Sequence, residues 1–134
     1  SIDPNRDAEW HYRIGKALSP LRSNNVLLVG SGHITHNLRA AFAEMSGRVS
    51  VPEAFSARVD SFTDWFAETV EAVDNAALLR WREDAPYVVD NHPTDEHLMP
   101  IFFAAGAGGA QSEGRRIHHS REGGVLTFDV YRFD

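Results

Sequence analysis

The spacing of apolar positions changes along the chain, and each change predicts a different element. Over residues 7 to 22 the apolar positions recur at helical spacing after Asp3-Pro4-Asn5, which predicts an amphipathic helix. Residues 26 to 29 are apolar without polar alternation, as in a strand that helices cover on both faces. This pattern favours an α/β fold in which helices layer against a central mixed sheet, in the order α/β/α.

The middle of the chain predicts mainly helices. The longest of them begins near Ser61, where Ser61 and Asp64 form a plausible capping pair. We expect a short helix at 37 to 44, an irregular stretch at 47 to 55, the long helix at 61 to 73 and a further helical turn or two at 76 to 83.

The C-terminal third predicts one more helix and a β-hairpin. Thr94 is a suitable N-cap for a helix that ends at Gly106, and Pro100 favours a kink inside it. Gly123-Gly124 supplies a turn, and the residues from 126 to 131 alternate at period two. No linker or repeat interrupts the pattern, so we treat residues 1 to 134 as a single unit.

Composition narrows the classes of function. The 134 residues are 43% hydrophobic and 24% charged, with a formal net charge of −6, and the basic residues are scattered. We therefore expect no nucleic-acid partner. No apolar run approaches the ~20 residues of a membrane helix, and no secretory leader is evident. These observations predict no membrane partner and a cytoplasmic location.

Two features of the sequence direct attention to histidine and to chain length. There is no cysteine, so any metal must be held by the seven histidines and by carboxylates. The sequence opens at Ser1 without an initiator Met and enters a helical pattern at once. We therefore expect a part of a longer polypeptide.

The Gly30-Ser31-Gly32 turn does not fit a nucleotide site. A dinucleotide fingerprint needs a third glycine where this chain has Thr35. The same glycines also lack the frame of a serine-hydrolase nucleophile. Instead, the turn would place His36 in the crevice at the carboxyl end of the strand, unless His36 caps or packs against the following helix.

Other histidines are weaker candidates. His92 and His97 bracket a predicted helix start, yet their spacing matches no standard helical metal pair, so they are either ligands or capping and surface residues. His118 and His119 are adjacent on a predicted strand and point to opposite faces, so at most one of them faces a site. We expect His33 to support the site or lie on the surface.

Three stretches together resemble a known family. They are "LRSNNVLLVGSGHITHNLR", "HPTDEHLMPIFFAAGAGG" and "GGVLTFDVYRF". In this order and spacing they resemble the C-terminal half of the DODA-type (4,5-DOPA) extradiol dioxygenases. These enzymes belong to the class III superfamily that includes the catalytic subunit of protocatechuate 4,5-dioxygenase.

The resemblance implies an enzyme that opens a catechol ring, such as that of DOPA, with O2 and one mononuclear Fe(II) or Zn(II) ion. Two histidine ligands of the family lie in an N-terminal half that this chain lacks, so that half is an expected partner. The resemblance implies catalytic roles for His36 and His97, and metal-ligand roles for His92 and His36. Glu96 or His97 are the alternatives to His92, and a homo-oligomer stays open.

Two other functions remain open from the sequence. One is a non-redox, zinc-dependent hydrolase that uses the same pocket. The other is a non-catalytic remnant of the same fold.

Overall fold

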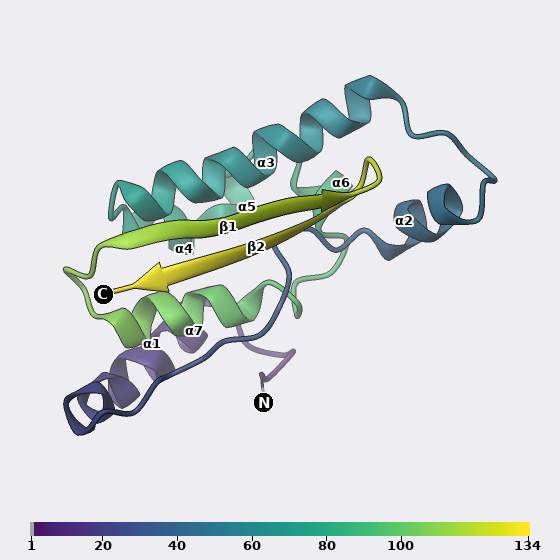
Figure 1. Cartoon of the computed structure of the whole chain (residues 1–134). Coiled ribbons are helices and arrows are strands. Elements are labelled where there is room, and N and C mark those ends of the chain that lie inside the picture. The colour runs from purple at the N-terminus through teal and green to yellow at the C-terminus, as the bar shows by residue number, and fades with distance from the viewer. Residues whose placement is uncertain (1) are drawn as a thin grey trace.

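The computed structural model describes residues 2–134 (Figure 1). About half of the chain is helical, and two strands follow the last helix. In chain order the elements are α1 (Ala8–Leu18), a 3-10 helix η1 (Ser19–Asn24), α2 (Leu38–Met45), α3 (Glu53–Glu71), α4 (Asn75–Leu79), α5 (Trp81–Asp84), α6 (Val88–Asn91), α7 (Met99–Gly108), β1 (Gly114–Glu122) and β2 (Leu126–Phe133).

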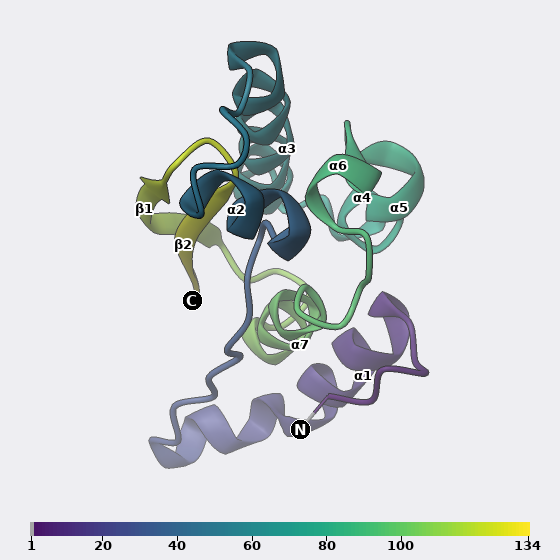
Figure 2. The same cartoon turned by 90° about the vertical axis from the view of Figure 1, so that its right-hand side faces the viewer.

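The hairpin of β1 and β2 lies between helices. Figures 1 and 2 show α3 along one side of it, α7 along the other, and α1 packed on the far side of α7. The strands are antiparallel with Ser120 opposite Phe128, and Gly123 turns the chain with a φ of 62°. The predicted α/β class and the predicted hairpin are therefore confirmed.

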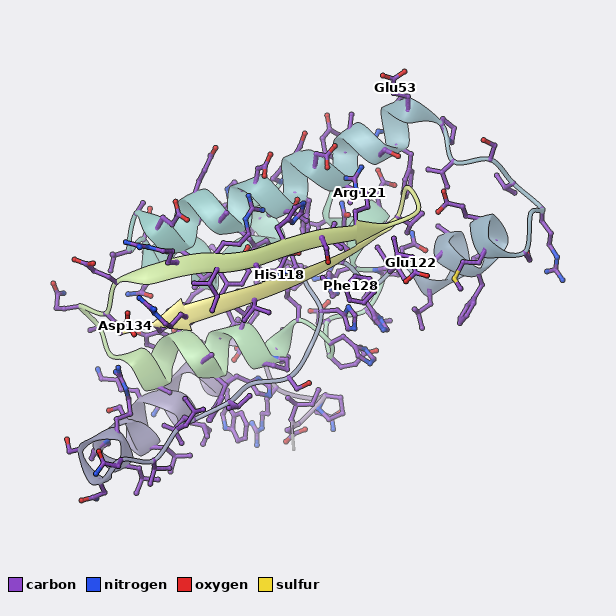
Figure 3. The ribbon with its side chains drawn as sticks, in the orientation of Figure 1. Glu53, His118, Arg121, Glu122, Phe128 and Asp134 are labelled. Carbon is purple, nitrogen blue, oxygen red and sulfur yellow. The ribbon has the colours of Figure 1, made fainter. Side chains whose placement is uncertain are left out.

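A hydrophobic core joins the helices. Phe62, Phe66 and Phe102 are completely buried within it. Helices α1 and α7 approach so closely that a Cβ on Gly15 would lie 2.0 Å from the Phe103 carbonyl oxygen. Polar side chains join the hairpin to α3: Arg121 extends from β1 toward this helix and pairs with Asp60 (Figure 3).

Helix α3 begins earlier than the sequence predicts. It starts at Glu53, which is labelled at the top right of Figure 3, rather than near Ser61. Pro52 stands at the N-cap position, where its lack of an N–H costs no helical bond. The Ser61 hydroxyl does not cap the helix and donates instead to the Ala57 carbonyl.

Helix α7 begins later than the sequence predicts. It starts at Met99, so Pro100 lies in its first turn, where no intrahelical donor is required, and the expected mid-helix position was wrong. The Thr94 hydroxyl does not cap this helix. It donates to the Glu96 carboxylate at 2.9 Å, which leaves the preceding loop free to form part of the site.

Residues 26 to 29 do not form the covered strand that their pattern predicts. The segment is extended, but it pairs with no strand among residues 2–134, and Leu27 and Val29 are 85% and 70% exposed. The only sheet in the described chain is the two-stranded hairpin, so the predicted central mixed sheet is not formed there. A strand needs neighbours to satisfy its backbone, and these residues have none.

The two glycines after this segment serve close packing rather than a strained turn. A Cβ on Gly30 would lie 2.4 Å from the Pro100 carbonyl oxygen, and one on Gly32 would lie 2.3 Å from the His97 carbonyl oxygen. The segment can therefore press its backbone against the start of α7. None of the helices among residues 2–134 combines the length and apolar character needed to cross a membrane.

Candidate metal centre

Two loops far apart in the sequence form the site. Residues 33 to 36 follow the extended segment and precede α2, and residues 91 to 97 connect α6 to α7. The backbone N–H of His33 donates to the His97 carbonyl, and that of His36 donates to the Asn91 carbonyl, each at 2.8 Å. These bonds fix the two loops edge to edge.

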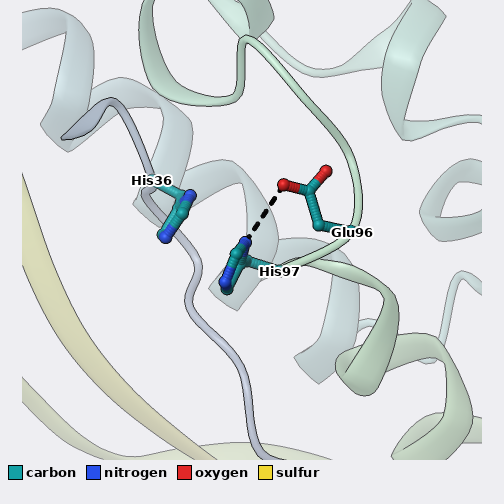
Figure 4. Close-up of side chains that lie close together, drawn as sticks. All are labelled: His36, Glu96 and His97. Atoms are coloured by element: carbon teal, nitrogen blue, oxygen red, sulfur yellow. Dashed lines mark ion pairs between the residues drawn. The ribbon is translucent and has the colours of Figure 1, made fainter. Parts of the chain in front are cut away.

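Three side chains from these loops converge on one point, as Figure 4 shows. The rings of His36 and His97 stack with centroids 3.5 Å apart and planes 17° from parallel. Glu96 Oε1 lies 3.3 Å from His97 Nδ1. One candidate ligand atom from each of His36, Glu96 and His97 lies within 4.8 Å of the others, which is close enough for one ion to reach all three.

The electrostatics of the cluster favour a neutral imidazole beside a carboxylate. Burial is the main cause that lowers the pKa of His36, and His97 and His33 lower it further. The backbone amide of Glu96 and the Thr94 hydroxyl lower the pKa of the Glu96 carboxyl. Neutral imidazole and ionised carboxylate are the forms that bind metals.

His92 lies behind the cluster and faces backbone rather than solvent. It is completely buried, with Nδ1 3.0 Å from the Thr94 carbonyl oxygen and Nε2 3.2 Å from the His33 carbonyl oxygen. Burial lowers its pKa to about 4, so the ring is neutral at pH 7 and donates to only one of the two carbonyls. The structure therefore places His92 between the loops and outside the cluster of candidate ligands.

Asn37 fastens the start of α2 to α6, the helix that precedes the second loop. Its Oδ1 accepts from the Ala40 N–H at 3.0 Å, which caps α2, and its Nδ2 donates to the Asp90 carbonyl at 2.8 Å. Because Asn37 directly follows His36, this double contact restricts the backbone that carries the His36 ring. His36 itself does not cap the helix.

A chain of hydrogen bonds connects the first loop to the hairpin. Buried Thr35 accepts from the backbone N–H of Thr127 at 2.8 Å, through its hydroxyl oxygen. The Thr127 hydroxyl donates to Asp129 Oδ2 at 2.7 Å, and Asp129 Oδ1 lies 2.7 Å from His119 Nδ1. The hairpin thus holds the residue immediately before His36.

The remaining histidines lie around or away from the cluster. The His33 ring contacts the edge of Phe128 with centroids 5.5 Å apart, next to the His36 ring. His118 contacts the Ser120 hydroxyl at 3.0 Å, while His119 pairs with Asp129. Neither of these hairpin histidines belongs to the cluster of candidate ligands.

Sequence reasoning did not find the residues that position the site. Asn37 had a detectable signal, because it precedes a helical pattern and asparagine is a favoured N-cap. Thr35 and Thr127 had none, because their contact joins residues from opposite parts of the chain. Glu96 entered only as an alternative ligand.

The donor set fits a mononuclear metal. Two imidazoles and one carboxylate are the ligand types of non-haem Fe(II) sites that leave coordination positions open for substrate, and zinc accepts the same donors. The fit is chemical: the three side chains that converge are of the right kind and are within reach of one ion.

The chain is similar to known ring-opening dioxygenases. The family model for the catalytic LigB subunit of aromatic ring-opening dioxygenase matches residues 1–128. A 4,5-DOPA dioxygenase extradiol from Beta vulgaris is 29% identical over 99% of this chain, and one from Mirabilis jalapa is 30% identical over 99%. One from Escherichia coli K12 is 30% identical over 80% of the chain.

A solved structure shares the fold. The crystal structure of an uncharacterized Escherichia coli K12 protein superposes with a TM-score of 0.74 at 26% identity, over 98% of this chain and 53% of that one. This chain spans about half the length of its relatives, 47% and 48% for the two plant enzymes. From the match over most of its length, the chain belongs to the LigB family of aromatic ring-opening dioxygenases.

Proposed function

We propose that this chain is the C-terminal half of an extradiol dioxygenase that opens the ring of a small catechol such as DOPA beside its two hydroxyls. The observation that carries the proposal is the convergence of His36, Glu96 and His97 on one point. The relatives, which are 4,5-DOPA dioxygenases, support the reaction class and the choice of DOPA as the first substrate to test.

In this proposal, Glu96 and His97 would hold the Fe(II) ion from this half of the protein, and His36 would lie beside it with its basic ring nitrogen free to exchange a proton. When this chain alone binds zinc, His36 would serve as the third donor. Further histidine ligands come from the N-terminal half, so the complete site lies where the halves meet. When bound, an Fe(II) ion supplies the redox chemistry that O2 requires and a position for both catechol oxygens. His92 supports the ligands from behind by holding the two loops together.

His36 is the acid/base of the proposal. Burial lowers its pKa, so its ring is neutral at pH 7 and accepts a proton from a catechol hydroxyl. The same nitrogen returns the proton to the product. His97 stacks on the ring of His36 and limits its rotation, which keeps the accepting nitrogen aimed at one place.

The test is oxygen uptake by protein that carries both halves, supplied with Fe(II) and L-DOPA. We expect oxygen consumption and a yellow ring-opened product, and we expect His36→Ala to reduce the rate by about 10²-fold or more. His118→Ala is the matched control, because this exposed histidine lies outside the cluster. Full activity of His36→Ala would remove His36 from the mechanism.

The same experiment separates the alternative functions. Zinc binding at one ion per chain without any oxygen uptake would favour a zinc-dependent hydrolase. Neither metal binding nor uptake, in a protein whose intact mass equals that of this chain alone, would favour a non-catalytic remnant.

A further inference from the structure

A long groove runs between the extended segment and the hairpin and reaches His33 and His97 of the candidate metal centre. Its volume is about 880 Å³. Residues 25 to 34 form one wall, residues 129 to 133 of β2 together with Asp134 form the other, and the apolar side chains of Ile101 and Ala104 on α7 contribute to the floor. Figure 1 shows the extended segment, in dark blue, crossing α7.

The β2 wall presents unpaired backbone groups. At one end of the groove, the Thr127 N–H donates to the Thr35 hydroxyl oxygen, and at the other the Phe133 carbonyl accepts from the Arg22 guanidinium at 3.3 Å. Both groups therefore point away from β1. Because direction alternates along a strand, the N–H and C=O groups of Asp129 and Tyr131 point the same way, into the groove.

The opposite wall has the same property. Among residues 2–134, no backbone hydrogen bond involves the amides of Leu27, Leu28 or Val29. The apolar run to which they belong has the composition of a covered strand, yet two of these side chains are largely exposed. A groove between two unpaired strand edges over an apolar floor matches a polypeptide strand, which satisfies both edges at once.

We propose that this groove receives one β-strand from the N-terminal half, which pairs with β2 on one side and with residues 27 to 32 on the other. This inference rests on the proposed function, which supplies the second half, and on relatives about twice as long as this chain. In Figure 1 the extended segment and β2 run in opposite directions. One strand between them is parallel to one neighbour and antiparallel to the other, so docking forms a mixed sheet.

The length of the groove sets the size of the docked strand. Thr127 and Phe133 mark its two ends, because their backbone groups already have side-chain partners, Thr35 and Arg22, which lie just outside the opposite wall. At about 3.4 Å per residue, the distance along β2 between them accommodates about five residues of an added strand. The same wall includes His33, where the metal-site loop begins, so the docked strand leads the N-terminal half to the site.

A proline scan tests the proposal. Leu27→Pro, Leu28→Pro and Val29→Pro each remove one amide that has no hydrogen-bond partner in this chain, so the melting temperature of the chain alone changes little. Binding of the separately produced N-terminal half is then measured by calorimetry. We expect an alternating result, in which proline weakens binding about tenfold or more only where the amide faces the groove.

Alanine variants at the same three positions are the matched controls, because they shorten the side chain and keep the amide. An alternating loss with proline but not with alanine supports strand pairing. Equal effects at all three positions, no effect, or no binding of the N-terminal half overturns the proposal. An alternating loss of binding without oxygen uptake would overturn the proposed function but support the docked strand. Oxygen uptake without an alternating loss would support the proposed function but overturn the docked strand.

Discussion

His36 and His97 stack face to face although they come from opposite parts of the sequence. Stacked neutral rings tolerate this contact, but two positive charges at 3.5 Å would repel strongly. Glu96 beside His97 offsets such charge, and its own pKa is lowered. At the scale of single residues, this arrangement supports the proposal that a cation would be shared by both rings and the carboxylate.

The first prediction concerns these ligands. We expect His36→Ala, Glu96→Gln and His97→Ala each to weaken zinc binding by this chain more than about tenfold, because each removes one of three donors. Isothermal titration calorimetry measures the effect. His118→Ala should bind zinc as the parent chain does, and unchanged binding by Glu96→Gln would exclude the carboxylate from the ligand set.

The second prediction concerns His92 and pH. Its pKa is about 4 in the folded chain and ~6.5 when unfolded, so between these values the unfolded state binds more protons. The free energy of unfolding should therefore fall as the pH is lowered from ~6.5, with a total loss on the order of 3 kcal/mol that is complete below about pH 4.

Urea unfolding of the metal-free chain between pH 4 and pH 7 measures this loss. In His92→Gln the dependence should become much shallower, whereas His118→Gln, a substitution at an exposed histidine, should keep it. An equally steep dependence in His92→Gln would assign the loss to other groups.

At the scale of elements, the hairpin and the first site loop are joined through Thr35. Thr35→Val keeps the shape of the side chain but leaves the buried N–H of Thr127 without its acceptor. We expect a loss of about 1–3 kcal/mol in the free energy of unfolding, together with weaker zinc binding, because the loop carrying His36 loses its anchor. Thr35→Ser keeps the hydroxyl and should have the parent's free energy of unfolding and zinc affinity. Normal zinc affinity in Thr35→Val would show that this contact stabilises the fold without supporting the metal site.

The close approach of the extended segment to α7 gives a fourth prediction. In Gly30→Ala the new methyl group would lie 2.4 Å from the Pro100 carbonyl oxygen. Because the clash is with backbone, neither chain segment can move away easily. We expect destabilisation of about 1–3 kcal/mol by thermal or urea unfolding. Ser31→Ala, at the exposed position between the glycines, is the control and should unfold as the parent does.

Elements with local signals could be predicted from the sequence, and elements that depend on distant partners could not. The alternation around Gly123-Gly124 predicted the hairpin, and Asn37 marked the start of α2. The start of α7 was missed because Thr94 bonds to Glu96 instead of capping the helix. In the site, His36 and His97 were candidates from their motifs, but the position of His92 depends on the carbonyl of His33, which no local pattern encodes.

At the scale of the whole molecule, apolar surface remains on the side that carries the groove and α2. Leu27, Val29, Phe42 and Met45 are all more than half exposed. The apolar run at residues 26 to 29 was interpreted as a covered strand because its composition is that of one. Among the described residues, nothing buries this run. Sequence periodicity shows that a segment is apolar, but it does not show which part of a protein covers it.

The fifth prediction concerns the stability of the molecule as a whole. A metal held by His36, Glu96 and His97 would bridge two loops that are distant in the sequence, and it would bind only the folded chain with this geometry. Zinc at about 100 times its dissociation constant should stabilise the chain by about 2.7 kcal/mol and raise its melting temperature, which scanning calorimetry measures. EDTA should reverse the shift, and a shift that persists in His97→Ala would place the zinc elsewhere.

Two of the bonds that hold the site loops together run between backbone atoms, from His33 to His97 and from His36 to Asn91. Replacing the side chain of His36 or His97 leaves all of these bonds in place. The scaffold of the site is thus separable from its chemistry, and the two ring positions can be exchanged for other donors without rebuilding the fold. This makes the pair a natural place to redesign the metal preference of the family.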